Sequence, residues 1–474
     1  MALRQDPLDS SPLMRERVVS ALVVRDSDPP QPPFRGAGGA ALASILIAAI
    51  AVGAVAVWAR FTGAGEQDWR DPGAVIVEAE TGARYLWREP LLHPLANYTS
   101  AQLLLGRPAP PTVTVPREAL DGIPRGRPLG IPGAPDSLPA AGALVRGAWT
   151  VCSGVGAAGG RPQAVLAAGG EVAGATGAGE AGGPAAGTAL ADRALLVRDP
   201  AGDPHLIWRE QRYRVRDPEV VLPALGWAGA PPAPVAQALL AALPARADLA
   251  RIEVPGLGQP APAVPGARAG EVFAVASRAG RPQHAVAFPD GLALLTPVQV
   301  DILLTDPRVG SVLGQEEPVP MSPAEFAALP KLDGEAVPGA GWPATVPPLV
   351  GWSDATATVC ALVPDGGEVT VVSVHSSLPA GAGTEGQGAP DTSTVQVRVE
   401  PGRAVLVSDG ETVDVVTDLG VRHAVGPQAV ALLGYGEVAP VRMPAPVVEL
   451  IPPGPALDPE RAEAGAGDTG AGGG

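Results

Sequence analysis

One long apolar segment stands out in a sequence whose hydrophobic runs are otherwise short. Residues 36–59 carry no charged side chain and lie between Arg35 and Arg60. At 1.5 Å per residue, a helix of this length crosses a hydrocarbon core of roughly 30 Å, so we predict a single transmembrane helix here. A buried helix or a signal peptide is the alternative, but a signal peptide has a shorter apolar region and starts nearer the N-terminus. The residues expected to lie in lipid or at its interface are Leu42, Ile45, Leu46, Ile50, Val55 and Trp58.

The arginines around this segment predict its orientation. Those before it are Arg4, Arg15, Arg17, Arg25 and Arg35. In the twenty positions that follow the segment, only Arg60 and Arg70 are basic. Because positively charged flanks stay on the cytoplasmic side, we expect residues 1–35 in the cytoplasm and the rest of the chain outside. The protein is then a single-pass protein of the inner (plasma) membrane.

The cytoplasmic segment contains a candidate contact helix. Between residues 13 and 24, apolar side chains recur at helical spacing, with charged residues between them. Such a helix contacts lipid or a partner subunit when it is amphipathic. A juxtamembrane helix with no special role is the alternative. The residues predicted to make the contact are Leu13, Arg15, Arg17, Val18, Leu22 and Arg25.

Four stretches after the membrane segment share one order of elements. Each contains an apolar strand, a tight Gly-containing turn, a second strand, a short third strand and a helix, over about 32 residues. They cover residues 74–106, 194–226, 272–304 and 404–434. A unit this small cannot bury its apolar face alone, so we expect the units to pack on one another. Chance similarity among short hairpins is the alternative.

The two cysteines, Cys152 and Cys360, both follow the membrane segment. Cysteines in an oxidising compartment tend to pair, so we predict a disulfide between them. Two unrelated buried thiols are the alternative. A metal site would need more ligands than two distant cysteines and five scattered histidines supply. We therefore predict no metal and no cofactor.

These elements predict an α+β protein in which the membrane helix precedes an elongated extracytoplasmic domain over residues 60–459. Four discontinuous β-β-β-α repeats are expected to surround a central, disulfide-linked region. The Gly/Ala-rich segment 165–190 is predicted to be flexible. Residues 369–374 and 395–399 are predicted to pair as strands. The acidic, Gly-rich tail 460–474 is predicted to be disordered.

Composition and charge narrow the possible functions. The 474 residues include 61 Gly and 56 Pro but only 4% aromatic residues, which favours modest folded units joined by irregular segments. The formal net charge is −16. Binding to nucleic acid needs a basic surface that neutralises phosphates, so we predict no nucleic-acid partner.

The sequence gives little support for an enzyme. A phosphate-binding P-loop needs a lysine after a glycine loop, and the only lysine, Lys331, has no such loop before it. A Gly-x-Gly-x-x-Gly pattern at Gly154, Gly156 and Gly159 precedes a strand-like run rather than a helix. Four of the histidines fall inside the repeats, which favours a structural role: His93, His205, His284 and His423. We predict no catalytic residue.

Three motifs together resemble one known family. The stretch from Gly126 to Asp136 reads GRPLGIPGAPD, and residues 149–152 read WTVC. Near the C-terminus, residues 416–423 read VTDLGVRH and residues 451–457 read IPPGPAL. Over residues 10–460, the chain resembles EccB, a membrane component of type VII (ESX) secretion systems of actinobacteria. It departs from that family in its long Gly/Ala segment after Cys152 and in the few cations of its N-terminal helix.

The resemblance implies a structural role in the inner membrane. Proteins of this family assemble with an EccC-type ATPase, EccD and EccE, self-associate as dimers and higher clusters, and scaffold the complex on its periplasmic side. It also implies two alternatives: a membrane-anchored module that binds peptidoglycan, and the ATPase activity ascribed to some members. We expect the structural role.

Overall fold

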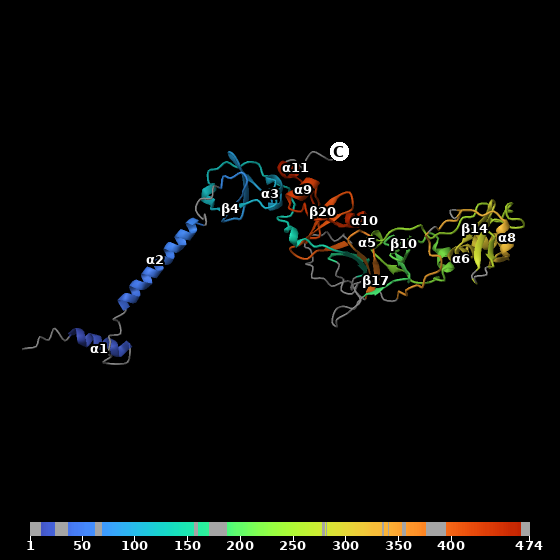
Figure 1. The fold of residues 1–474 in the computed structure, drawn as a ribbon, viewed down its shortest axis with the longest axis horizontal. Helices are drawn as coiled ribbons and strands as arrows, with labels where there is room; N and C mark the ends of the chain where they lie inside the picture. The colour runs from blue at the N-terminus through green and yellow to red at the C-terminus, as the bar shows by residue number, and fades with distance from the viewer. Residues whose placement is uncertain are drawn as a thin grey trace, which may run out of the picture.

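Figure 1 shows an elongated chain of small folded units in a computed structural model. Its N-terminal helices lie at one end of the long axis, and α8 (Pro323–Ala328) lies at the other. The fold is α+β. The structure describes residues 11–23, 37–61, 69–155, 160–169, 187–276, 280, 282–333, 336–339, 341–352, 357–375 and 395–465.

Two helices precede the first sheet: α1 (Ser11–Val23) and α2 (Ala37–Phe61). Among the described residues, α2 is the one helix long and apolar enough to cross a membrane. Its bounds agree with the predicted span of residues 36–59 to within two residues at each end.

Each of the four predicted stretches forms a four-stranded sheet with one helix. Unit 1 contains β1 (Val75–Glu78), β2 (Arg84–Arg88), β3 (Leu91–Pro94), α3 (Tyr98–Leu105) and β4 (Thr112–Val115). Unit 2 contains β8 (Leu195–Arg198), β9 (Pro204–Trp208), β10 (Gln211–Arg214), α4 (Pro218–Ala224) and β11 (Ala233–Pro234). Unit 3 contains β12 (Val272–Val275), β13 (Gln283–Phe288), β14 (Gly291–Leu295), α6 (Pro297–Thr305) and β15 (Val319–Met321). Unit 4 contains β19 (Ala404–Ser408), β20 (Val413–Thr417), β21 (Arg422–Ala424), α9 (Pro427–Leu432) and β22 (Val441–Arg442).

The four sheets share one topology, in which three antiparallel strands are followed by a helix and a fourth strand. The fourth strand returns parallel to the first, so unit 1 has the strand order β3-β2-β1-β4. The predicted unit of about 32 residues is therefore too short. The fourth strand is only two to four residues long, and only β4, with the sequence TVTV, has an alternating pattern to mark it.

Beyond the fourth strand, every unit continues with a short return helix and an extended segment. The return helices are η1 (Arg117–Leu120), α5 (Gln237–Ala242), α8 and α10 (Ala445–Glu449). The extended segments bridge in parallel to the third strands, as at Leu92 with Arg125, Arg212 with Ala245, Leu292 with Lys331, and Arg422 with Pro453. Complete units therefore span residues 75–129, 195–249, 272–332 and 404–457.

Both faces of these small sheets are covered, which explains their continuous apolar strands. In unit 1, Val75 and Leu86 pack in one cluster with Ala101 of α3. Ile76 and its neighbours pack in another cluster with Trp69. A strand buried on both faces reads as an unbroken hydrophobic run rather than as an alternating one.

A fifth group of strands forms the central sheet, in the order β18-β6-β5-β16-β17-β7. Its strands are β5 (Trp149–Gly154), β6 (Gln163–Ala168), β7 (Thr188–Ala189), β16 (Thr358–Val363), β17 (Val371–His375) and β18 (Val395–Arg398). The predicted pairing of residues 369–374 with 395–399 is wrong. The β5–β6 hairpin and β16 lie between these two strands, so β17 pairs with β16 and β18 pairs with β6.

The chain runs outward through the units and then returns. Helix α3 of unit 1 contacts α9 of unit 4, α5 of unit 2 contacts α10 of unit 4, and α4 of unit 2 contacts α6 of unit 3. Along the long axis the units therefore follow the order 1, 4, 2, 3, with the central sheet beside units 4 and 2 (Figure 1). One apolar core joins the central sheet to these two units, and another joins units 2 and 3.

The predicted disorder of the tail and the predicted flexibility of segment 165–190 need correction. The predicted tail 460–474 begins inside α11 (Pro459–Ala464), which contacts α3, because Ala462 is buried and its carbonyl accepts a bond from the Gly130 amide. In the Gly/Ala-rich segment 165–190, Val165 and Leu166 of β6 are buried at one end and Leu190 is buried at the other. Residues 466–474 and 170–186 lie outside the described residues.

Candidate functional site

Helix α2 presents an apolar surface that no described part of the chain covers. The window Gly39–Val57 has a mean hydropathy of 2.6, and none of it is buried. The predicted side chains Leu42, Ile45, Leu46, Ile50 and Val55 are all at least 62% exposed. Trp58 lies near the C-terminal end of the same helix. An uncovered helix that is apolar on every side has the properties of a membrane span.

Helix α1 carries five of the six residues predicted to make a cytoplasmic contact: Leu13, Arg15, Arg17, Val18 and Leu22. Val18 and Leu22 are one turn apart, and their side chains are 56% and 78% exposed. Arg25 lies outside the described residues. The structure thus leaves an exposed apolar pair beside an exposed Arg15 on this helix.

The central sheet brings the two cysteines together. Cys152 in β5 lies directly opposite Cys360 in β16. Their Sγ atoms are 2.09 Å apart, the distance of a disulfide bond, and each residue is 2% exposed. Because β5 precedes units 2 and 3 in the chain and β16 follows them, this bond closes the loop that contains both units.

A buried polar pair lies beside this bond. Ser373 is the cross-strand neighbour of Cys360, and its Oγ is 2.8 Å from Nε2 of His375. Burial lowers the pKa of His375, so its imidazole is neutral at pH 7. A Cβ at Gly187 would lie 2.1 Å from Cε1 of His375, so only glycine fits against this ring.

The same arrangement of histidine and glycine recurs in units 1 and 4, where we call it the His–Gly clasp. In unit 1, Nδ1 of His93 in β3 is 2.9 Å from the carbonyl oxygen of Arg127, and the ring lies against Gly126. In unit 4, Nδ1 of His423 is 2.9 Å from the carbonyl oxygen of Pro455, and the ring lies against Gly454. Each clasp holds the extended segment of the unit against its third strand.

The other two repeat histidines occupy a different position. His205 and His284 lie in the second strands, β9 and β13. Nε2 of His205 is 3.3 Å from Oδ2 of Asp199, whose other oxygen accepts two backbone N–H bonds of the preceding turn. Burial lowers the pKa of His205 by more than the nearby carboxylate of Asp199 raises it. His93, His205 and His423 thus contact other groups of their own units.

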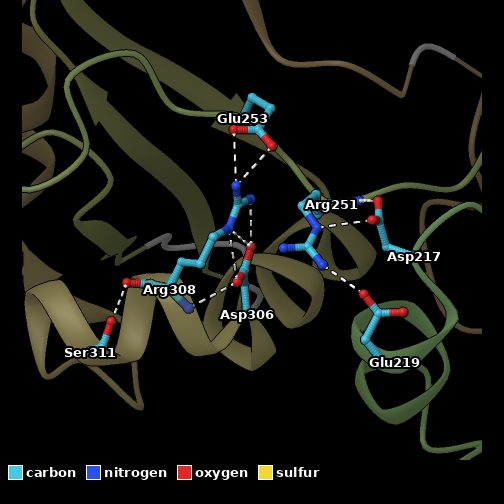
Figure 2. A network of polar contacts seen from close by, with 7 residues as sticks. All are labelled: Asp217, Glu219, Arg251, Glu253, Asp306, Arg308 and Ser311. Carbon is cyan, nitrogen blue, oxygen red and sulfur yellow. Dashed lines mark hydrogen bonds and ion pairs between the residues drawn. The ribbon is translucent and has the colours of Figure 1, made fainter.

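Units 2 and 3 meet at a network of charged side chains (Figure 2). Arg251 pairs with Asp217 at 3.0 Å and with Glu219 at 2.7 Å, both near the start of α4. Arg308, in α7 (Pro307–Leu313), pairs with Asp306 at 2.8 Å and with Glu253 at 2.9 Å.

Asp306 is the most buried member of this network, at 1% exposure, and its side chain also caps α7. Burial acts to raise the pKa of Asp306, but hydrogen bonds from the side chain and backbone of Arg308 outweigh it and hold that pKa below its usual range. Sequence reasoning missed this network because it joins residues from segments that are separate in the chain. The only local signal was Asp306 before Pro307, a typical helix start.

The Gly-x-Gly-x-x-Gly pattern lies between two paired strands. Gly154 ends β5, and β6 follows in antiparallel register. Residues 156–159 lie outside the described part of the chain. A nucleotide-binding glycine loop leads into a helix whose N-terminus holds phosphate, and this hairpin leads into a strand instead. The ammonium group of Lys331 donates to the carbonyl oxygens of Phe326 and Leu329, at the end of α8.

A family model described as type VII secretion system ESX-1, transport TM domain B, matches residues 8–469. The chain belongs to this family, EccB. The ESX-2 secretion system ATPase EccB2 of Mycobacterium tuberculosis is 30% identical over 420 residues, which cover 82% of this chain and 81% of that protein. The ESX-3 secretion system ATPase EccB3 of the same species is 30% identical over 432 residues, covering 81% and 75%.

Solved structures from ESX complexes share this fold. An EccB3 dimer from the ESX-3 core complex superposes with a TM-score of 0.61 at 28% identity, covering 82% of this chain and 99% of that one. A chain of an intact ESX-5 inner membrane complex superposes with a TM-score of 0.62 at 24% identity and covers 98% of this chain and 95% of that one. This EccB chain is therefore a membrane component of a type VII secretion system, with the α+β architecture of its relatives.

Proposed function

We propose that this EccB chain is a structural subunit that scaffolds the periplasmic side of a type VII secretion complex. The observation that carries the proposal is the combination of one uncovered apolar helix with a long ectodomain whose units pack on one another at three helix contacts. Such a chain can hold other subunits at fixed distances from the membrane. The relatives in an ESX-3 core complex and an ESX-5 inner membrane complex support this role.

The proposal includes the orientation of the chain and its partners. The arginines before α2 favour a cytoplasmic N-terminus and place units 1 to 4 outside. The disulfide between Cys152 and Cys360 then forms in the oxidising compartment. Helix α1 and α2 contact an EccC-type ATPase and the EccD and EccE membrane subunits, and the ectodomain self-associates, as the solved dimer of a relative supports.

The name ATPase is borne by the EccB relatives, and we do not extend the activity to this chain. The glycine pattern that could suggest a nucleotide site lies in an antiparallel hairpin, and the single lysine closes the end of α8. ATP turnover by the purified chain is the direct assay. A rate that scales with chain concentration and survives further purification would make the protein an enzyme.

Deletion of the chain tests the scaffold role. An EccC-type ATPase is tagged in cells with and without this chain, and its detergent-extracted complex is sized. We expect the complex to shrink or dissociate in the deletion strain and to recover with the full chain. A complex of unchanged size without this chain would contradict a scaffold role.

Cysteine labelling tests the orientation. Ser27→Cys lies before α2 and Ser137→Cys lies on the exposed surface after unit 1. A membrane-impermeant thiol reagent applied to cells with a permeable outer envelope is expected to label residue 137 and not residue 27. The opposite labelling would invert the orientation.

A further inference from the structure

The return helices of units 2 and 4 are packing surfaces. In α5 of unit 2, Ala238, Leu239, Leu240 and Ala242 are buried, and α5 contacts β5, β16 and α10. In α10 of unit 4, Val447 and Val448 are buried. The two helices therefore pack against each other, α5 also on the central sheet and α10 on β19, within the apolar core that joins the central sheet to units 2 and 4.

The return helix of unit 3 occupies the equivalent position and has no such neighbour. Helix α8 contains no buried residue, and it lies at the end of the molecule that is farthest from α2 (Figure 1). Ala327 and Ala328 are exposed, and Phe326 is only half-buried against the core of the unit. Where units 2 and 4 bury their return helices, unit 3 leaves this surface open.

A groove of about 540 Å³ runs beside α8, and we call it the α8 groove. One wall is the loop that precedes β12, with Val264 and Ala267, and the other consists of β15 and α8, with Met321 and Leu329. Phe273 of β12 also lines it. The volume falls in the range of sites that enclose small ligands or a few side chains of a peptide.

Carboxylates lie in and beside this groove. Glu271 and Glu325 line it, and Glu316 and Glu317 are exposed just before β15. Within the described part of unit 3, the ion pairs are those of Arg308, which involve none of these four carboxylates. Nearby Lys331 is bonded to carbonyl oxygens at the end of α8. Glu271 and Glu325 each accept one backbone N–H bond, from Arg268 and Ser322, and neither forms an ion pair among the described residues. The groove therefore combines apolar side chains with negative charge.

The charge and the edge strand restrict what can bind. A second copy of this chain that packed through the same face would bring the same carboxylates to the groove, and like charges across an interface are unfavourable. Strand addition along β15 is impeded because Pro320 in this three-residue strand has no N–H to donate. The features that remain are pockets for apolar side chains and acceptors for cations.

We propose that the α8 groove is a docking site for a segment of a partner protein in which apolar side chains are flanked by Lys or Arg. The apolar side chains fill the space between the loop before β12 and α8. The cations pair with Glu271 and Glu325. This site goes beyond the scaffold role, because it lies at the opposite end of the molecule from α2.

Peptide display tests the proposal on the full chain in lipid nanodiscs. Random dodecapeptides are selected on the wild-type chain, and the affinity of enriched peptides is then measured on variants. We expect the enriched sequences to combine Lys or Arg with aliphatic or aromatic residues. Binding should weaken at least tenfold in the double variant Glu271→Gln, Glu325→Gln and also in Ala328→Trp, which narrows the groove. Higher salt should weaken it further, because salt screens exposed charges.

A matched control is Glu437→Gln, which removes an exposed carboxylate from unit 4. It should leave peptide binding within twofold of the wild-type value. The proposal is overturned if no sequence is enriched, if enriched peptides lack cations, or if they bind Ala328→Trp with wild-type affinity. Self-association of the chain that Ala328→Trp abolishes would also overturn it, in favour of a contact between copies. None of these outcomes depends on assembly of the secretion complex, so the scaffold role and this site fail separately.

Discussion

Gly126→Ala tests whether the His–Gly clasp of unit 1 is as tight as the structure has it. A Cβ at residue 126 would lie 2.3 Å from Cε1, 2.6 Å from Nδ1 and 2.7 Å from Nε2 of His93. Favourable contacts between such atoms need about 3.5 Å, so the imidazole must move away. The ring then loses its hydrogen bond to the carbonyl oxygen of Arg127, which lies 2.9 Å from Nδ1 in the unchanged protein.

The expected cost follows from these two effects. Overpacking costs about 1–3 kcal/mol, and the lost hydrogen bond costs about 0.5–1.5 kcal/mol. Replacing glycine stabilises the protein by about 0.4–1 kcal/mol, because the unfolded chain becomes less flexible. We therefore expect a net local destabilisation of about 2 kcal/mol, which corresponds to roughly a thirtyfold change in the opening equilibrium.

Hydrogen exchange of the full chain measures this opening directly. The reporters are the amides of Gly126, which donates to Leu92, and of Leu92, which donates to Pro124. We expect both to exchange roughly thirtyfold faster in Gly126→Ala. In a His93→Ala background, the same glycine substitution should change the rate by less than threefold.

Gly142→Ala is the matched control, because nothing lies within 4 Å of a Cβ at that position. It should leave the exchange of both reporter amides unchanged. Wild-type exchange rates in Gly126→Ala would refute the reasoning. So would an equal acceleration in the presence and absence of the His93 ring, since the cost would then have another source.

Three further predictions concern the central sheet, the charged network and the C-terminal helix. Thiol labelling of the unreduced, denatured chain should be silent at Cys152 and Cys360, and loss of this bond should lower stability by up to about 5 kcal/mol in denaturant unfolding, because the closed loop is long. Arg308→Met should destabilise units 2 and 3 at neutral pH. Arg308 holds the pKa of Asp306 below 3.8, so the stabilisation that it gives the folded protein is complete above pH 3.8. The difference in unfolding free energy between wild type and Arg308→Met should therefore shrink as the pH falls below 3.8. Glu463→Gln should speed amide exchange in α11 a few-fold, because its ion pair with Arg88 is half-exposed and contributes at most about 1 kcal/mol.

Local sequence signals predicted the first three strands and the helix of each unit. Their apolar runs and glycine turns are contiguous, and the side chains involved interact within a few tens of residues. The fourth strand β11 has only two residues, Ala233 and Pro234, and depends on a parallel partner that is distant in the chain. No local pattern marks such a strand, so its existence is decided by the packing of the unit.

Some features of the candidate sites likewise have a local sequence signal, and others have none. The uncharged run of α2 is a property of the sequence itself, and the structure leaves it uncovered as predicted. The pairing of Arg88 with Glu463 joins the first unit to the last helix, and the approach of Gly126 to His93 depends on a bridge between an extended segment and β3. These contacts are tertiary, and neither residue of such a pair carries a signal for the other.

The central claim is that this EccB chain acts as a structural subunit of a larger membrane complex. The most direct test is affinity purification of the full-length chain from native membranes in mild detergent, with sizing and mass spectrometry of the eluate. The account predicts elution in an assembly far larger than a dimer, together with an EccC-type ATPase and polytopic membrane partners. Recovery as a free monomer or dimer, under conditions that keep other membrane complexes intact, would contradict it.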